Sequence, residues 1–431
     1  MRGPSPLPAL KIPARGGYHL LDLRIPQCVT TLDREPDGEG CVRADITIGA
    51  DGQIESVHPR GDVNFRYPVV QAMGRQVWPA FFDIHAHLDK TATWTRAPNP
   101  DGTFDGAIAA SREARRTPWG EDDIYARMRA AALDAYRFGT LGIRTHIDSS
   151  LSRGPSGWRA FERLRRDLAG KMKIQGVTLF VGTEILKNAN ALVALCKRYK
   201  AALGPVFHPS VGMDGEIRKV FEVAEAHALD LDIHVDETGQ PNADALRVIA
   251  DLVSQRTFRQ RIICGHACSL SLWPKDAAQS TINKLSAAGV GIVTLPATNL
   301  YLQGRTPGET PQWRGITRIH EMRSAGIDVA IAGDNRRDAF YPFGDYDMLD
   351  VFRDAVRIAH LDQPMAGWVD AVTRIPATLM GYDNCGRIAA GTEATMIAFP
   401  VSTAAEVLAF RGENRQLIER GRLRRGQAEL R

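Results

Sequence analysis

The chain has little cysteine and no long hydrophobic run, and each scarcity excludes a class of protein. Its 431 residues include only six cysteines and no CxxC pair, so neither a disulfide framework nor a zinc ribbon is indicated. No segment approaches the roughly 18 consecutive apolar residues of a membrane helix, and the first residues, MRGPSPLPALKIPARG, lack the apolar stretch of a secretion signal. We therefore expect a cytoplasmic protein with no membrane partner.

Charge of one sign is also scarce, because 54 lysines and arginines face 50 aspartates and glutamates, for a formal net charge of +4. The segment from Arg411 to Arg431 holds seven arginines and three glutamates, which accounts for the whole excess. A basic tail suits an anionic partner. However, no aromatic residues interleave there for base stacking, and QLIERGRLRRG also reads as two short strands around a glycine turn. We expect no nucleic-acid partner.

The hydrophobic pattern changes twice along the chain. Residues 1–78 alternate as antiparallel strands do, with a hairpin turn at Ala50-Asp51-Gly52, and short strands return after residue 385. Between them, helix-length amphipathic stretches separate eight short apolar runs: AFFDIH, LGIRTHID, IQGVTLFVG, LGPVFHP, LDIHVDE, IICGHA, GVGIVTLP and DVAIAG. Continuous apolar strands separated by helices indicate a parallel sheet covered on both faces. Eight of them predict an α/β fold, a (β/α)8 TIM-type barrel over residues 79–385.

The longest connection in the predicted barrel follows its first strand. This connection contains the glycine- and proline-rich segment WTRAPNPDGTFDGAI. Long loops beside the catalytic face of a barrel commonly carry function. We therefore interpret this segment as a candidate lid.

Five side chains that suit a metal site fall at the ends of predicted barrel strands. Residues i and i+2 of a strand point to one face, so the HxH of FDIHAH presents His85 and His87 together. His234, His266 and Asp334 lie at the ends of LDIHVDE, IICGHA and AIAGDN. Active sites of this barrel lie at the C-terminal rim of the strands, so we expect these five side chains to converge there.

Imidazole and carboxylate groups favour a borderline divalent ion such as Zn²⁺ or Fe²⁺ over Ca²⁺ or Mg²⁺. A single strand-end histidine is more commonly a satisfied core or surface residue, and it is the conjunction of five groups that favours a metal. His146, at the end of LGIRTHID, is a further candidate, with a supporting role. Glu237 follows His234 by three residues, where a carboxylate can take and return a proton during hydrolysis. Alternatively, Glu237 is a carboxylate at a helix N-terminus.

At these motifs the chain resembles the amidohydrolase superfamily and, within it, the cytosine deaminase-like branch. The likeness covers most of the chain. It is carried in order by DIHAHLDK, RTHID, DIHVDE, the strand of His266, LYLQGR followed by RGITRIHEM, and GDNRRDAFYPFGDYDM. Taken in that order, the motifs are a specific signal.

The resemblance implies a role for each of these side chains. His266 would face the attacking water or the substrate, and Glu237 would carry the proton. The implied catalytic residues are Glu237, His266 and Asp334, and the implied metal ligands are His85, His87, His234 and Asp334. The resemblance also implies that residues 1–78 and 386–431 form one small β-sandwich domain built from both chain termini.

The number of metal ions follows from a residue that is missing. Dinuclear members of the superfamily bridge two metals with a carboxylated lysine at the end of the fourth barrel strand. That strand reads LGPVFHPSVG here and has no lysine, and Lys200 lies before it, on the wrong side of the barrel. We therefore expect one divalent transition metal per chain, zinc or iron, which disfavours the dihydroorotase and dihydropyrimidinase readings.

Mononuclear relatives are mostly deaminases of aromatic nitrogen heterocycles. The hypothesis is therefore a metal-dependent hydrolytic deaminase that releases ammonia, a hydrolase acting on carbon–nitrogen bonds other than peptide bonds, in cyclic amidines. Its partners would be a small heterocyclic substrate and water, and a homo-oligomer is possible. Two alternatives stay open: an amidohydrolase that removes a substituted amine from a triazine-like ring, and a metal-binding barrel without catalysis.

Two positions depart from cytosine deaminases. Asn335 follows Asp334 where those enzymes have a second aspartate, and the third strand ends in FVGTEIL, with Val181-Gly182 or Thr183 nearest where they place a glutamine. The loss of a bulky amide makes room in the pocket and removes a polar partner. We therefore expect a larger amino-pyrimidinone, such as a pterin, to be a better substrate than cytosine.

Two further elements are candidates for substrate binding. Gln303, in LQGR, would read a carbonyl and amine edge like that of cytosine. Arg336 and Arg337 would meet an anionic substituent on the ring, although pairing with Asp338 or exposure to solvent is the alternative. The candidate substrate-binding residues are therefore Gln303, Asn335 and Arg337.

Overall fold

The computed structural model describes residues 6–114, 116, 119–150, 155–409 and 414–424. Contacts between Cα atoms divide the chain into two compact units. The barrel unit comprises residues 83–136 and 142–347, and the terminal unit comprises residues 1–82, 137–141 and 348–431. Three of the seven arginines of the predicted basic tail, Arg411, Arg425 and Arg431, lie outside the described residues.

An eight-stranded sheet forms the centre of the barrel unit, and each strand pairs with the next strand along the chain. The pairs from β6–β7 to β11–β12 are parallel. The strands are β5 (Phe81–Ala86), β6 (Thr140–Asp148), β7 (Lys173–Val181), β8 (Ala202–Phe207), β9 (Leu231–Val235), β10 (Ile262–His266), β11 (Gly291–Thr294) and β12 (Val329–Ile331). All residues of β5, β9, β10, β11 and β12 are buried, which explains their continuous apolar runs.

The last strand meets the first one again. Ala86 forms a parallel bridge with Asp334, and the Asp334 amide donates a hydrogen bond of 2.7 Å to the His85 carbonyl. This contact joins the two ends of the sheet into a nearly closed barrel. The (β/α)8 fold predicted from the sequence is therefore confirmed.

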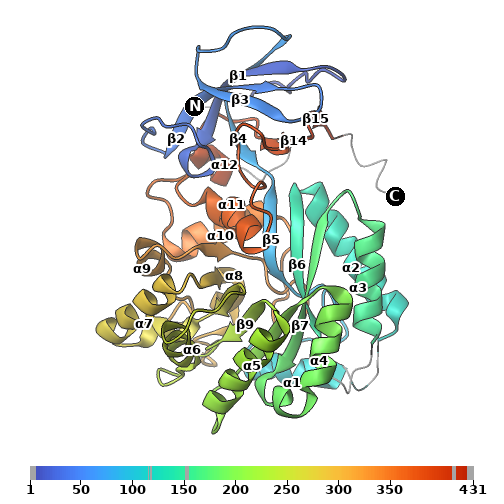
Figure 1. Cartoon of the computed structure of the whole chain (residues 1–431), viewed down its shortest axis with the longest axis vertical. Coiled ribbons are helices and arrows are strands. Elements are labelled where there is room, and N and C mark those ends of the chain that lie inside the picture. The colour runs from blue at the N-terminus through green and yellow to red at the C-terminus, as the bar shows by residue number, and fades with distance from the viewer. Residues whose placement is uncertain (1–5, 115, 117–118, 151–154, 410–413, 425–431) are drawn as a thin grey trace. The chain divides into compact units, whose positions relative to one another are not determined.

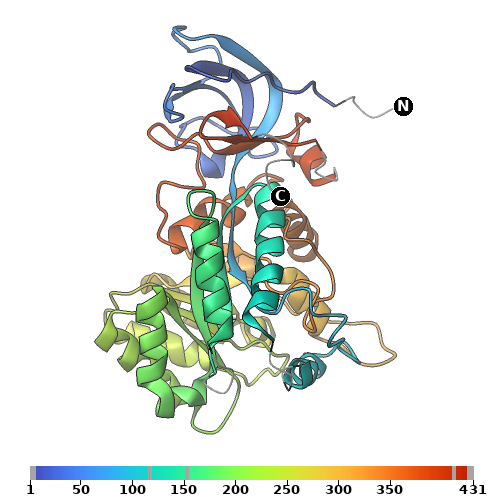
Figure 2. The ribbon, with the colours of Figure 1, turned by 90° about the vertical axis from the view of Figure 1, so that its right-hand side faces the viewer.

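Amphipathic helices connect the strands and cover the sheet from outside (Figure 1 and Figure 2). Helix α3, for example, buries Trp158, Phe161 and Leu164 at helical spacing and turns its arginines outward. The helices of this unit are α1 (Phe104–Ala114), α2 (Glu121–Arg137), α3 (Ser156–Asp167), α4 (Ile185–Tyr199), α5 (Met213–His227), α6 (Ala245–Ser254), α7 (Lys275–Ala287), α8 (Pro296–Leu302) and α9 (Ile319–Ser324).

The terminal unit holds a separate mixed sheet that combines both ends of the chain (Figure 1). Its seven strands lie in the order β15-β14-β13-β4-β1-β2-β3. Strand β13 pairs antiparallel with β4, and this pair joins the C-terminal strands to the N-terminal ones. The strands are β1 (Tyr18–Pro26), β2 (Cys41–Ile48), β3 (Ile54–Pro59), β4 (Val69–Pro79), β13 (Met396–Ala398), β14 (Gln416–Glu419) and β15 (Arg422–Leu423).

Both turns predicted in this sheet are present. The turn between β2 and β3 closes with a hydrogen bond from the Gly52 amide to the Gly49 carbonyl, and Gly52 has a φ of +82°. Within the predicted strand–turn–strand segment, residues 416–423 form β14 and β15 around Gly421, whose φ is +70°. Both glycines adopt a left-handed conformation that other residues rarely take.

Three more helices belong to the terminal unit: α10 (Met348–Ala359), α11 (Arg374–Leu379) and α12 (Ala404–Ala409). The contacts thus group residues 348–385 with the terminal sheet, whereas the sequence pattern placed them with the barrel. The boundaries expected at residues 78/79 and 385/386 stay a prediction. Among the helices of the described residues, none is both long enough and apolar enough to cross a bilayer.

Candidate active site

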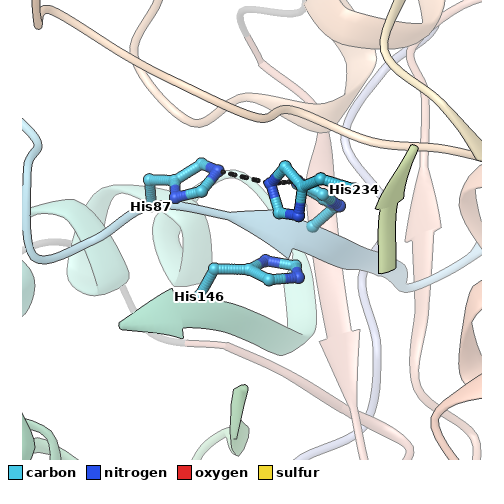
Figure 3. Close-up of side chains that lie close together, drawn as sticks. His87, His146 and His234 are labelled. Atoms are coloured by element: carbon cyan, nitrogen blue, oxygen red, sulfur yellow. Dashed lines mark hydrogen bonds between the residues drawn. The ribbon is translucent and has the colours of Figure 1, made fainter. Parts of the chain in front are cut away.

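A cluster of histidine rings lies at the C-terminal ends of the barrel strands. His85 lies in β5 and His87 follows it directly, His146 lies near the end of β6, and His234 lies in β9. The ring centroids of His85 lie 4.0 Å from His146 and 4.5 Å from His234. Figure 3 shows the rings of His87, His146 and His234 gathered at one point. The strand-end positions predicted from the sequence therefore converge.

The ring nitrogen atoms of this cluster point toward one another at short distances. The Nε2 atom of His234 lies 3.1 Å from Nε2 of His85 and 3.4 Å from Nε2 of His87. Asp334 Oδ1 lies 3.3 Å from Nε2 of His87 and 3.8 Å from Nε2 of His85. Within the described residues, neither buried carboxylate oxygen of Asp334 has a hydrogen-bond partner. A buried carboxylate with no donor beside several converging imidazoles fits a cation.

The donor set suits a divalent transition metal. In one group, single ligand atoms of His85, His87, His146 and His234 all lie within 4.8 Å of one another, and a second such group consists of His85, His266 and Asp334. Burial, followed by the positive charges that neighbouring side chains would carry, lowers the pKa of His85, His87 and His234 well below 6.5. These imidazoles are therefore neutral at pH 7, which is the form that binds a metal.

The backbone is left-handed at two of the strand-end residues. His266 has a φ of +68° and Asp334 a φ of +61°. Such angles are uncommon for residues other than glycine and cluster at functional sites. They place both side chains at the rim just where the strands end.

Glu237 and His266 form a second group beside the histidine cluster. Glu237 Oε1 lies 3.3 Å from His266 Nδ1. The Nδ2 atom of Asn299 lies 3.4 Å from Glu237 Oε1 and 3.0 Å from His266 Nδ1. Gln303 donates a hydrogen bond of 3.3 Å to the Glu237 carbonyl. Asn299 and Gln303 lie four residues apart, so one turn of α8 brings both amides to Glu237.

The two carboxyl groups of the site hold protons more tightly than usual. Burial raises the pKa of Glu237 well above its usual value, the negative charge of Asp334 raises it further, and Lys90 opposes the rise. Burial and the charge of Asp338 likewise raise the pKa of Asp334. A cation bound beside Asp334 would lower its pKa again. A carboxyl group with a raised pKa beside the cavity is suited to hold a proton and pass it on.

His146 is anchored by residues that sequence analysis missed. Its Nε2 atom lies 3.2 Å from Asp232 Oδ1, and Arg144 donates a hydrogen bond of 2.8 Å to Asp232 Oδ2. Burial alone would raise the pKa of Asp232, but the positive charges of His146 and Arg144 lower it instead. Asp232 lies two residues before His234 on the same face of β9. This spacing in the sequence could have identified Asp232 as a residue near the site.

Replacing Asp232 by asparagine is expected to lower the free energy of unfolding by about 3 kcal/mol. The change leaves the buried guanidinium of Arg144 without a neighbouring negative charge. Denaturant unfolding of Asp232→Asn against the unmodified protein measures the loss, with Asp230→Asn as a control, since that side chain is 37% exposed. An unfolding free energy unchanged by Asp232→Asn would contradict the expectation.

A cavity of about 790 Å³ opens beside the cluster. Its outer part is lined by Phe104 and Arg112 of α1 and by His208, directly after β8. Lys90 also lines it, is 7% exposed, and places Nζ 5.0 Å from the ring centroid of Phe340. The inner part is formed by His87, His234, Glu237, His266 and Asp334. The proposed proton carrier and metal ligands thus share one cavity with room for a small molecule.

The segment interpreted as a lid contributes directly to this cavity. Helix α1 begins within it, and Phe104 and Ile108 line the cavity wall. The apolar face of α1 packs against a small hydrophobic cluster of Ala107, Leu302, Ala339 and Phe340. The segment therefore covers the site, and its movement stays a prediction.

The three candidate substrate-binding residues have different surroundings. Asn335 lines the cavity, and its Nδ2 donates a hydrogen bond of 2.6 Å to Asp338. Gln303 is buried behind Glu237 rather than in the cavity wall. Arg337 is not among the residues that line the cavity, and its half-exposed guanidinium lies 3.9 Å from Asp134. A role for Arg337 in substrate binding stays a prediction.

The end of the third barrel strand and the fourth strand match the sequence argument. Val181 lines the cavity at the end of β7, where no amide side chain fills the space. Strand β8 contains no lysine, and Lys200 lies before it, at the end of α4, with a φ of +52°. No lysine on β8 can therefore bridge two metal ions at the rim.

Comparisons with known proteins agree with this geometry. Residues 159–419 match the model of the amidohydrolase family. A pterin deaminase from Rhizobium rhizogenes is 36% identical to this chain over 413 residues, covering 95% of this chain and 94% of that protein. The chain belongs to the amidohydrolase family. This amidohydrolase acts on carbon–nitrogen bonds other than peptide bonds, in cyclic amidines, and the enzyme class predicted from the sequence is confirmed.

Solved structures support the fold of this amidohydrolase. A 5-methylcytosine deaminase from Klebsiella pneumoniae, liganded with phosphonocytosine, superposes with a TM-score of 0.81 at 21% identity, covering 95% of this chain and 98% of that one. An N-isopropylammelide isopropylaminohydrolase from Burkholderia multivorans gives a TM-score of 0.75 at 21% identity, with the same coverage. At these identities the likeness concerns the fold.

Proposed function

We propose that this amidohydrolase hydrolytically deaminates an amino-substituted nitrogen heterocycle with an amino-pyrimidinone edge, a pterin in preference to cytosine, and releases ammonia. The observation that carries the proposal is the 36% identity, over nearly the whole of both chains, to a pterin deaminase. The cavity of about 790 Å³ is consistent with it, because it has room for a two-ring substrate beside Glu237.

One divalent transition metal per chain, zinc or iron, would be held by His85, His87, His234 and Asp334. When bound, such an ion lowers the pKa of a water molecule from 15.7 to roughly 7 and so supplies a nucleophile at neutral pH. The neutral state of the buried imidazoles supports this ligand set. His146 lies in the same cluster, and its contact with Asp232 favours a supporting role.

The chain's own residues would move the protons of the reaction. Asp334 takes a proton from the attacking water as its oxygen bonds to the ring carbon that carries the amino group. Glu237, whose pKa is raised by burial, gives its proton to the adjacent ring nitrogen. His266 donates a hydrogen bond to the oxygen that has been added. Glu237 then takes the proton of the added hydroxyl and gives it to the amino nitrogen, the carbon–nitrogen bond breaks, and ammonia leaves as the ring carbonyl forms. The proton held by Asp334 returns to Glu237 and restores both groups.

Substrate size should separate a pterin from cytosine. Val181 lines the cavity at the end of β7, where it fills less space than a long amide would, and a one-ring substrate would leave that part of the cavity empty. We expect kcat/KM for pterin to exceed that for cytosine by at least about tenfold, a difference of about 1.4 kcal/mol in transition-state binding. Ammonia release from both compounds, at equal metal loading, measures the ratio. Faster turnover of cytosine by the same factor would contradict this assignment of the substrate.

A second candidate is the removal of a substituted amine from a triazine-like ring. It is favoured by a likeness of 22% identity over 294 residues to an N-isopropylammelide isopropyl amidohydrolase from Pseudomonas. The two activities differ in their products, ammonia or an alkylamine, and a screen of amino-pyrimidines, pterins, purines and alkylamino-triazines separates them. The buried Glu237 beside the metal cluster disfavours a binding protein without catalysis, because a structural metal site has no need for an uncoordinated carboxylate.

A further inference from the structure

A single buried amide touches both Glu237, the proposed proton carrier, and His266, the proposed hydrogen-bond donor to the added oxygen. Asn299 lies in the middle of α8 and is 1% exposed. Its Nδ2 atom lies 3.0 Å from His266 Nδ1 and 3.4 Å from Glu237 Oε1. Asn299 is not among the residues that line the cavity, so it acts on the reaction only through these two neighbours.

The hydrogen-bonding groups of the Asn299 amide determine which nitrogen of His266 carries its hydrogen. A carboxamide nitrogen carries two hydrogens and accepts none, and a neutral imidazole carries one hydrogen on one of its two nitrogens. When Asn299 donates to His266 Nδ1, that nitrogen must be bare, and the imidazole hydrogen lies on Nε2. Within the described residues, His266 Nε2 is buried and has no hydrogen-bond partner. The Nε2–H group is then available to a bound molecule.

The same amide nitrogen also faces Glu237, whose Oε1 lies 3.3 Å from His266 Nδ1, so the amide lies between two acceptors. Donation to Oε1 makes that oxygen an acceptor and leaves Oε2 to carry the transferable proton. Gln303 fixes the backbone of the same residue through the Glu237 carbonyl. Asn299 of α8 and Gln303, directly after that helix, thus contact the side chain and the backbone of Glu237.

The backbone around Asn299 is tightly held. The Asn299 amide donates to the Leu295 carbonyl at 3.0 Å, and the Gln303 amide donates to the Asn299 carbonyl at 2.9 Å. Gly315 lies against this turn, where a Cβ atom would come within 2.7 Å of the Asn299 carbonyl oxygen. Because α8 is fixed on both sides, the amide has little freedom to leave its two partners.

We propose that Asn299 is a positioning residue: it keeps the hydrogen of His266 on Nε2 and orients the carboxyl group of Glu237. The inference rests on the proposed function, because it assigns how the proton carrier Glu237 and the hydrogen-bond donor His266 of that site are oriented. The opposite orientation of the amide would present its oxygen to His266 and place the hydrogen on Nδ1. The two orientations therefore give opposite tautomers, which an experiment can tell apart.

The first measurement needs no substrate. In the zinc-loaded protein labelled with ¹⁵N-histidine, the chemical shifts of the two ring nitrogens distinguish a protonated nitrogen from a bare one. The His266 signals are assigned as those lost in His266→Gln. We expect Nε2–H in the unmodified protein and a shift toward Nδ1–H in Asn299→Asp, whose carboxylate only accepts hydrogen bonds. Nδ1–H in the unmodified protein would overturn the proposal.

The second measurement is kinetic, with pterin as the substrate. Asn299→Leu preserves the size of the side chain without its hydrogen bonds, and Asn299→Asp preserves its shape without its donors. Removing a supporting hydrogen bond of this kind commonly costs about 10–100-fold in activity. We expect both variants to lose at least about tenfold in kcat, with KM within about threefold and with unchanged metal content. Asn283→Asp, on the exposed face of α7, is the matched control and should match the unmodified enzyme.

The outcomes separate this inference from the proposed function. An unmodified enzyme that releases ammonia, together with Asn299 variants of full kcat, overturns the positioning role alone. A loss of kcat that is matched by loss of metal or by a lower Tm in both variants also overturns it, because it indicates a merely structural side chain. An unmodified enzyme that releases no ammonia from any heterocycle overturns the proposed function, while the nitrogen shifts still decide the His266 tautomer.

Discussion

Replacing Glu237 by glutamine is expected to lower kcat by about 10²–10⁴-fold without removing the metal. Glutamine keeps the length of the side chain and can still accept a hydrogen bond from Asn299 through its amide oxygen. It cannot carry the proton that burial and the charge of Asp334 hold on Glu237. The measurement compares kcat for ammonia release with the metal content of the same protein preparation.

A matched control is available in the same unit. Glu216, on α5, is 7% exposed and, like Glu237, has a pKa raised by burial, but it does not line the cavity. Glu216→Gln should keep its kcat, since it removes a buried carboxyl group away from the reacting atoms. If Glu237→Gln loses its metal instead of its turnover, Glu237 is a ligand and its role as a proton carrier is wrong.

The positions of the candidate ligands follow from the sequence because strand geometry fixes them. His85 and His87 share a face through the period of two residues, and parallel strands bring His234 to the same rim. The sequence motifs thus predict that His85 and His234 lie close together, and their Nε2 atoms are 3.1 Å apart. The register of a buried strand leaves little freedom at these positions.

The partners of the ligands could not be predicted in the same way. Asn299 reaches Glu237 and His266 only because α8 docks beside β10, and no periodicity in the sequence encodes that docking. His208 and Phe104 meet at the cavity with ring centroids 6.0 Å apart, although 104 positions separate them in the chain. Such contacts depend on the path of loops, which local patterns do not determine.

Arg337 lies in a loop, where a sequence pattern does not fix the direction of a side chain. Its position three residues after Asp334 suggested a side chain near the substrate. Arg337 has a left-handed φ of +52°, and its guanidinium lies 3.9 Å from Asp134 of α2. Arg336, one residue earlier, is buried and donates a hydrogen bond of 2.8 Å to the Asn335 carbonyl. Substrate binding by Arg337 therefore stays a prediction.

Removing the metal is expected to abolish activity, and one zinc or iron ion per chain should restore it. Chelation followed by metal analysis and an ammonia assay tests both statements. His234→Ala should fail to recover, because it removes the nitrogen that lies closest to Nε2 of His85 and of His87. His227→Ala, at the exposed end of α5, is the control and should recover fully.

The pH at which the metal is lost follows from the imidazole pKa values. Protons compete for a histidine ligand only below its pKa, and burial lowers the pKa of His85, His87 and His234 well below 6.5. Metal content should therefore stay constant as the pH falls from 7.5 to about 6 and decline only in stronger acid. Loss already near pH 6.5 would show that these imidazoles titrate as exposed ones do.

The number of metal ions per chain tests the mononuclear site. A reproducible content near two ions per chain would contradict it, because β8 supplies no lysine to bridge a second ion.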